Sequence, residues 1–138
     1  MEKFIYKAVI LVVIITSSLI YKKATAFSID GKWIFNESLT TQALLKNRTL
    51  TNKDKKELFE LYSGSSIEFK NGAFKTRVKG HVDSHHYRVV NQDSDSMTIG
   101  YLGGGLTQDK DIEIHEVDQG CLYLESVFNG LKLYYCKT

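Results

Sequence analysis

The sequence has no proline, only two cysteines and no large excess of charge of either sign. Its 138 residues hold 18 basic and 16 acidic side chains, and 43% are hydrophobic, with seven Phe, eight Tyr and one Trp. A chain with this content of apolar and aromatic residues is neither disordered nor collagen-like, and its length suits one modest domain. The composition alone names no chemistry.

The first 26 residues have the pattern of a secretory signal peptide. Lys3 and Lys7 precede an apolar stretch from Ala8 to Tyr21, and the segment ends in Ala24-Thr25-Ala26, a small-residue cleavage pattern. As a helix the stretch spans about 21 Å, short of a hydrocarbon core of about 30 Å, so we expect cleavage rather than a membrane anchor. The mature domain, residues 27–138, is then periplasmic or secreted and has no membrane association.

Signal cleavage removes most of the positive charge. The mature chain has 14 basic and 15 acidic residues. Nucleic-acid binding needs a clustered excess of Lys and Arg. The densest charged run, residues 53–57, mixes both signs and is typical of a solvated helix face. We therefore expect no nucleic-acid partner.

The two cysteines, Cys121 and Cys136, both lie in the exported part, where a disulfide is stable. The bond would close a loop of about 16 residues and stabilise the domain by about 3 kcal/mol. A Cys-x-x-Cys spacing and a nearby His at ligand spacing are both absent, which disfavours a redox pair or a metal site. We predict a disulfide between them.

The mature chain predicts a first strand, a helical segment and then seven short strands. The first strand is Ile29 to Phe35, with an alternating pattern. A short helix is expected over Leu39–Leu45 and a firmer one over Asn52–Tyr62, which begins with a capping box at Thr51 and Asp54.

Turn residues set the pairing of the later strands. Asn71-Gly72 favours a two-residue hairpin that places Phe69 opposite Phe74. Asp118-Gln119-Gly120 favours a three-residue loop that places Ile114 opposite Leu124. The predicted inward-facing set of the last three strands is Ile112, Ile114, Leu122, Leu124, Phe128, Leu131, Leu133 and Tyr135.

Asn129-Gly130 favours a final hairpin that places Leu124 opposite Tyr135. This pairing leaves Cys121 and Cys136 on a diagonal, about 7–8 Å apart between Cα atoms. A disulfide prefers about 5.5–6 Å, so strong twist or a bulge has to bring the two cysteines together.

Two more strands are predicted between the hairpins, His86 to Val90 and Met97 to Leu102. The glycine-rich segment from Gly103 to Lys110 indicates a long flexible connection. A meander of eight short strands exposes two edges unless the sheet closes on itself.

The first strand contains Gly31-Lys32-Trp33, which resembles the Gly-x-Trp signature of lipocalin and calycin barrels. The order of strand, helical segment and antiparallel meander is also similar to small lipocalin-like barrels. The resemblance implies a mainly β fold: an antiparallel up-and-down barrel of about eight strands with a helical lid segment between the first and second strands. It further implies that Trp33 plugs one end and that the other mouth admits an apolar molecule.

We expect a monomeric binding protein for a small apolar or amphipathic ligand. The expected ligand-binding residues are Trp33, Leu58, Phe59, Tyr62, Phe69, Phe74 and Tyr101. An eight-stranded interior either holds one small ligand or is filled by its own side chains. In a filled barrel, the Gly103–Lys110 loop becomes an interaction element that inhibits or neutralises a protein partner in the periplasm or outside the cell.

Motifs for acyl transfer, zinc proteolysis and phosphate binding are absent from the sequence, so we expect no enzyme and no cofactor. His81, Asp83, His85 and His86 form the one dense cluster of metal-ligating residue types, and a polar turn between strands is favoured over a metal site there. His115, beside Glu113, is expected to be a solvated surface residue.

Overall fold

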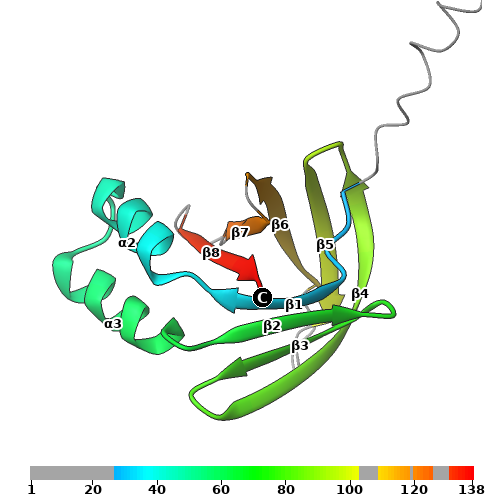
Figure 1. The fold of residues 1–138 in the computed structure, drawn as a ribbon, viewed down its shortest axis with the longest axis horizontal. Helices are drawn as coiled ribbons and strands as arrows, with labels where there is room; N and C mark the ends of the chain where they lie inside the picture. The colour runs from blue at the N-terminus through cyan, green and yellow to red at the C-terminus, as the bar shows by residue number, and fades with distance from the viewer. Residues whose placement is uncertain (1–26, 103–108, 119, 126–130) are drawn as a thin grey trace, which may run out of the picture.

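The computed structural model describes residues 27–102, 109–118, 120–125 and 131–138. The predicted signal peptide, residues 1–26, lies outside this range. Figure 1 shows the described strands wrapped into a barrel, with the helices together at one end. The strands are β1 Gly31–Phe35, β2 Ser66–Lys70, β3 Ala73–Val78, β4 His81–Gln92, β5 Ser96–Leu102, β6 Asp109–Val117, β7 Cys121–Glu125 and β8 Lys132–Lys137, and the helices are α2 Glu37–Lys46 and α3 Asn52–Tyr62.

The strands form one closed antiparallel barrel in sequence order. Strand β8 returns to pair with β1, for example Tyr135 with Phe35 and Lys137 with Trp33. Closure removes the exposed edges that an open meander would keep. The predicted fold class, with its helical segment between β1 and β2, is confirmed.

Alternate side chains of each strand point into the barrel and form the core. Ile114 and Leu122 are fully buried, and Ile112 and Leu124 are half-buried against the same cluster. Phe128, predicted for this face, lies outside the described residues. The buried core residues are Phe27, Ile29, Trp33, Phe35, Leu44, Ile67, Phe69, Phe74, Met97, Ile99, Ile114, Leu122, Leu131, Leu133 and Tyr135.

The end of the barrel away from the helices is covered by the chain that leads into β1. Phe27 and Ile29 are buried there. The Trp33 indole Nε1 donates to the Ile29 carbonyl at 2.7 Å, and Gln92 Nε2 donates to the Phe27 carbonyl at 2.9 Å. The Trp33 side chain is 3% exposed, so this end is closed.

Helix α3 has the predicted capping box. The Thr51 hydroxyl accepts from the Asp54 N–H at 3.1 Å, and the Asp54 carboxylate accepts from the Thr51 N–H at 3.3 Å. The Thr51 hydroxyl also donates to the Asp54 carboxylate at 2.7 Å, and this bond, together with the one from the Thr51 N–H, holds the pKa of Asp54 below its ordinary value. Of the two described helices, neither is long and apolar enough to cross a bilayer.

Helix α2 begins directly after β1, at the point where the pairing of β1 with β8 ends. The Asn36 side chain accepts from the Leu39 N–H at 2.9 Å as the N-cap. The Asn36 N–H donates to the Tyr134 carbonyl, and the fully buried Thr40 hydroxyl accepts from the Tyr134 N–H at 3.0 Å. The helix start therefore satisfies the β8 backbone groups beyond the last pair with β1.

Two of the predicted registers are confirmed. Phe69 lies opposite Phe74 across a turn in which Asn71 and Gly72 have φ of 53° and 71°. Positive φ at both positions is what the two-residue hairpin requires. Ile114 lies opposite Leu124 in the β6–β7 pair, also as predicted.

The predicted pairing of β7 with β8 is wrong by two residues. Leu124 lies opposite Leu133, not Tyr135, and the last described pair is Glu125 with Lys132. The Asn129-Gly130 turn, from which the register was predicted, lies outside the described residues. Because side chains alternate with a period of two, a two-residue shift keeps the same residues inside the barrel.

The shift also places Cys121 directly opposite Cys136. Their Cα atoms are 4.0 Å apart and the two sulfurs are bonded. The predicted disulfide is confirmed, and the diagonal geometry that stood against it does not occur. The Asn36 amide Nδ2 lies 3.4 Å from Cys136 Sγ, so the bridge adjoins the start of α2.

Strand β4 begins earlier than the sequence indicated. The predicted polar turn of residues 81–86 is the first half of β4, and the turn lies instead at Lys79 and Gly80, with φ of 50° and 79°. Residues 81–84 are exposed on both faces of the strand. An alternating apolar pattern requires one buried face, so this stretch carries no strand signal.

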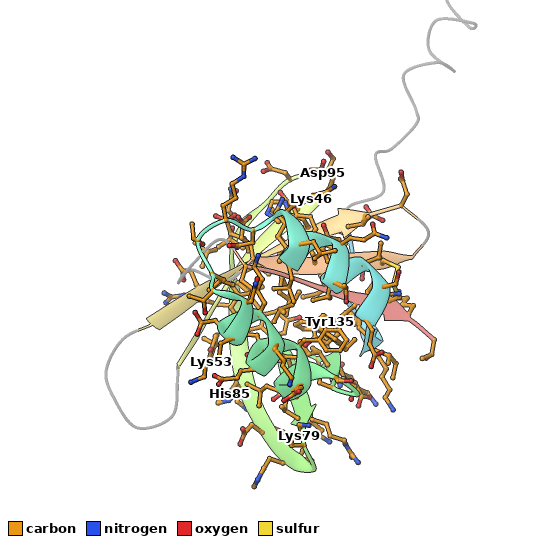
Figure 2. All side chains as sticks on the ribbon, turned by 90° about the vertical axis from the view of Figure 1, so that its left-hand side faces the viewer. Lys46, Lys53, Lys79, His85, Asp95 and Tyr135 are labelled. Atoms are coloured by element: carbon orange, nitrogen blue, oxygen red, sulfur yellow. A yellow bond between two sulfur atoms is a disulfide. The ribbon has the colours of Figure 1, made fainter. Side chains whose placement is uncertain are left out.

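Tyr135 is a buried tyrosine at the helix-covered end, onto which Figure 2 looks. Its hydroxyl lies 3.2 Å from the hydroxyl of Ser65, and its ring packs edge-on against Phe35 with centroids 5.6 Å apart. Burial raises the pKa of Tyr135 to about 12, and the hydrogen bond with Ser65 acts in the opposite direction.

Replacing Cys121 and Cys136 together by alanine is expected to lower the free energy of unfolding by about 3 kcal/mol, because the unfolded chain regains the freedom of the closed loop. Urea unfolding measures the change. Reducing agent should destabilise the wild type by the same amount and leave C121A/C136A unaffected. Equal stability of oxidised and reduced wild type would contradict this prediction.

The raised pKa of Tyr135 predicts a loss of stability in alkaline solution. The unfolded phenol ionises near pH 10 and the folded one near pH 12. The stabilisation that the neutral, buried phenol gives the folded state is therefore complete below pH 10 and is lost as the pH rises toward 12. From pH 8 to pH 11 the wild type should lose about 1.4 kcal/mol more than Tyr135→Phe in urea unfolding. Parallel losses in the two proteins would show that the prediction is wrong.

Candidate functional site

A hollow of about 250 Å³ extends from the middle of the barrel to its helix-covered end. It lies between strands that face each other across the barrel, and inward-pointing aliphatic side chains form most of its wall. Those side chains are Ile67, Ile99, Ile112, Ile114, Leu124 and Leu133.

The mouth of the hollow is more polar than its floor. Tyr62 of α3 lines it on one side, and Val78, His85 and Tyr101 of β3, β4 and β5 line it on the other. Thr76 adds a hydroxyl. Burial raises the pKa of Tyr101, with a smaller contribution from Tyr62, so the phenol stays neutral and able to donate a hydrogen bond.

An aromatic cluster centred on Phe74 occupies one side of the interior. The Phe74 ring centroid lies 5.9 Å from Phe69, 5.4 Å from the His85 imidazole and 5.2 Å from Tyr101, which meets it edge-on. Tyr87 lies 6.3 Å from it. The cluster narrows the hollow without filling it, because the aliphatic side chains of β5–β8 leave the opposite side open.

The structure brings together four of the seven predicted ligand-binding residues. Tyr62, Phe69, Phe74 and Tyr101 all line the hollow. These four belong to α3 and to β2, β3 and β5, which are adjacent only in the folded barrel.

The other three predicted residues lie elsewhere. Trp33 packs at the closed end, with the Lys137 ammonium 4.9 Å from its ring centroid. Leu58 and Phe59 of α3 pack against the core, and Phe59 meets Phe35 edge-on with centroids 6.2 Å apart. None of the three is among the residues that line the hollow.

Sequence reasoning missed His85, Thr76 and Val78 as lining residues. His81 and His85 belong to the cluster of metal-ligating residue types that the sequence contains, but both lie on β4, four residues or about 13 Å apart, and do not converge. The pairing of Phe74 with His85 points His85 inward. The β3–β4 register could not be predicted because the sequence of the first half of β4 indicated a turn.

A larger groove of about 450 Å³ lies outside the barrel, between α2 and β8. Leu39, Ala43 and Lys46 line it on the helix side, and Leu131 and Tyr134 line it on the strand side. The barrel interior is the better candidate because the strands of the closed barrel surround it and most of its wall is apolar.

The comparisons with known proteins found no family model, no curated protein and no solved structure that matches this chain. The candidate site therefore rests on the geometry of the barrel interior.

Proposed function

We propose that residues 27–138 form an exported, lipocalin-like binding protein that takes one small apolar or amphipathic molecule into the barrel. The supporting observation is the interior hollow, with its aliphatic floor and polar mouth. Ligand sites in proteins commonly combine a mainly apolar wall with a few polar groups that orient the ligand. Gly31-Lys32-Trp33 on β1 and the closed eight-stranded barrel support the lipocalin-like assignment.

The volume of the hollow limits the size of the ligand. A cavity of about 150 Å³ is enough for benzene, whereas pockets for drug-sized ligands span about 300–1,000 Å³. At about 250 Å³, the hollow fits a single substituted ring or a short acyl chain. A long-chain lipid exceeds it.

The positions of the polar groups favour one orientation of the ligand. Its apolar part would pack against Ile99 and Ile114 in the floor, and its polar end would stay near His85 and Tyr101. Imidazole and phenol groups both donate and accept hydrogen bonds, so one alcohol, phenol or acid group could be satisfied there.

Helix α3 is the element best suited to admit the ligand. None of its residues is fully buried, and it packs on the barrel through the half-buried side chains of Leu58, Phe59 and Tyr62. A segment with few buried contacts moves locally at lower cost than the strands beneath it.

Export is part of the same proposal. The signal-like first 26 residues support it, and so does the Cys121–Cys136 disulfide, since such bonds persist mainly in oxidising compartments.

Filling the mouth should abolish binding. Val78→Phe places a ring in the hollow, whereas Arg77→Phe, one residue away and exposed, leaves the hollow open. Calorimetric titration with 4-ethylphenol and octanoate should show binding by wild type and R77F and none by V78F, with hexadecanoate excluded from all three.

Native mass spectrometry of the purified wild type adds a search for a retained molecule. If neither probe binds and no retained molecule is found, the carrier function is wrong and a filled-barrel interaction protein is favoured. Undiminished binding by V78F would place the ligand outside the barrel.

The role of His85 can be tested with a matched pair of ligands. His85→Leu removes the polar ring and should weaken the binding of 4-ethylphenol by about fivefold, because one neutral hydrogen bond contributes about that factor to the affinity. The binding of ethylbenzene, which has no hydroxyl group, should stay unchanged. Competition titrations measure both affinities. An equal loss for the two ligands would mean that His85 contributes only its shape.

A further inference from the structure

Three potential metal-ligating side chains converge on the outer face of β6 and β7. His115 Nε2 lies 3.4 Å from Glu113 Oε2 and 3.8 Å from Glu125 Oε2. Among the side chains that the structure describes, Glu113, His115 and Glu125 are the one group of three such residues with all ligand atoms within 4.8 Å of one another. The group is outside the barrel and independent of the interior hollow.

The strand register places two like charges face to face. Glu113 pairs directly with Glu125 across β6 and β7. Like charges at directly opposed positions destabilise a sheet, and a bound cation removes that penalty. Lys132, the β8 partner of Glu125, has its ammonium over the Tyr123 ring, 4.9 Å from the centroid.

The His115 imidazole is held in position by its cross-strand partner. It stacks on the Tyr123 ring with centroids 4.6 Å apart and an interplanar angle of 16°. Its side chain is 29% exposed, and those of Glu113 and Glu125 are 59% and 34% exposed. The stacking fixes the ring plane so that Nε2 faces the carboxylates, as a ligand-holding contact should.

A polar hollow of about 230 Å³ adjoins the group. Glu113 and His115 form one wall, and Asn91, Asp93 and Thr98 of the β4–β5 region form the other. The hollow leaves room for water or a further oxygen ligand beside the three side chains.

We propose that Glu113, His115 and Glu125 bind a divalent zinc ion. Zinc accepts imidazole nitrogen and carboxylate oxygen at about 2.0–2.2 Å, so neighbouring ligand atoms of a tetrahedral site lie about 3.4 Å apart. The two histidine–carboxylate distances are close to that value. Three protein ligands leave the fourth position to water from the adjoining hollow, as in exchangeable rather than closed sites.

Zinc titration of the chelator-treated, full mature chain tests this site. Calorimetry should find one zinc ion per chain, and His115→Ala, Glu113→Gln and Glu125→Gln should each weaken binding by about tenfold or more. The controls are His81→Ala and His86→Ala, which remove exposed imidazoles from β4 and should bind like the wild type. Cobalt substitution adds a visible absorption band that should disappear in H115A.

Three outcomes would overturn the proposal. The first is no zinc binding by the wild type. The second is unchanged affinity in H115A, and the third is loss of binding in the β4 controls. If H115A fails to fold, the near-isosteric E113Q and E125Q variants decide the question. Binding of organic ligands by the barrel interior is measured separately, so either proposal can fail without the other.

Discussion

The pairing of β8 with β1 is the constraint on which the rest of the structure depends. It turns a meander into a closed barrel and so gives every strand an inside and an outside. The first turn of α2 continues this seam, since Asn36 and Thr40 take up the Tyr134 backbone groups beyond the last β1 pair. The disulfide holds β7 to β8 beside it. The helices, the core and both candidate sites are placed relative to this closure.

The two ends of the barrel differ because different side chains fill them. At one end Trp33 and the chain before β1 pack tightly, with the indole hydrogen-bonded to Ile29. At the other end α3 supplies only half-buried side chains, and the aromatic cluster around Phe74 occupies one side of the interior. An interior of this width is sensitive to single side-chain volumes, and Val78 and Thr76 are two of the smaller side chains that line the hollow.

Much of the fold was predictable because its signals are local. Alternation identified the strands with one buried face, and the Asn71-Gly72 turn identified its hairpin register. The start of β4 was missed because residues 81–84 are exposed on both faces. The predicted β7–β8 register depended on the Asn-Gly turn alone, and the observed pairs differ from it by two residues. The β6–β7 register, predicted correctly, already pairs Glu113 with Glu125 and His115 with Tyr123, so the zinc proposal could have been drawn from it.

The sequence by itself determined the mainly β architecture, the capped helix, the cysteine pair and the described inward-facing residues of the last three strands, because each follows from periodicity or from the conformational needs of a few neighbouring residues. Only the tertiary structure decided that the barrel keeps a hollow and that His85 lines it. These properties depend on how side-chain volumes from distant strands add up around a closed interior, a sum that no local pattern contains.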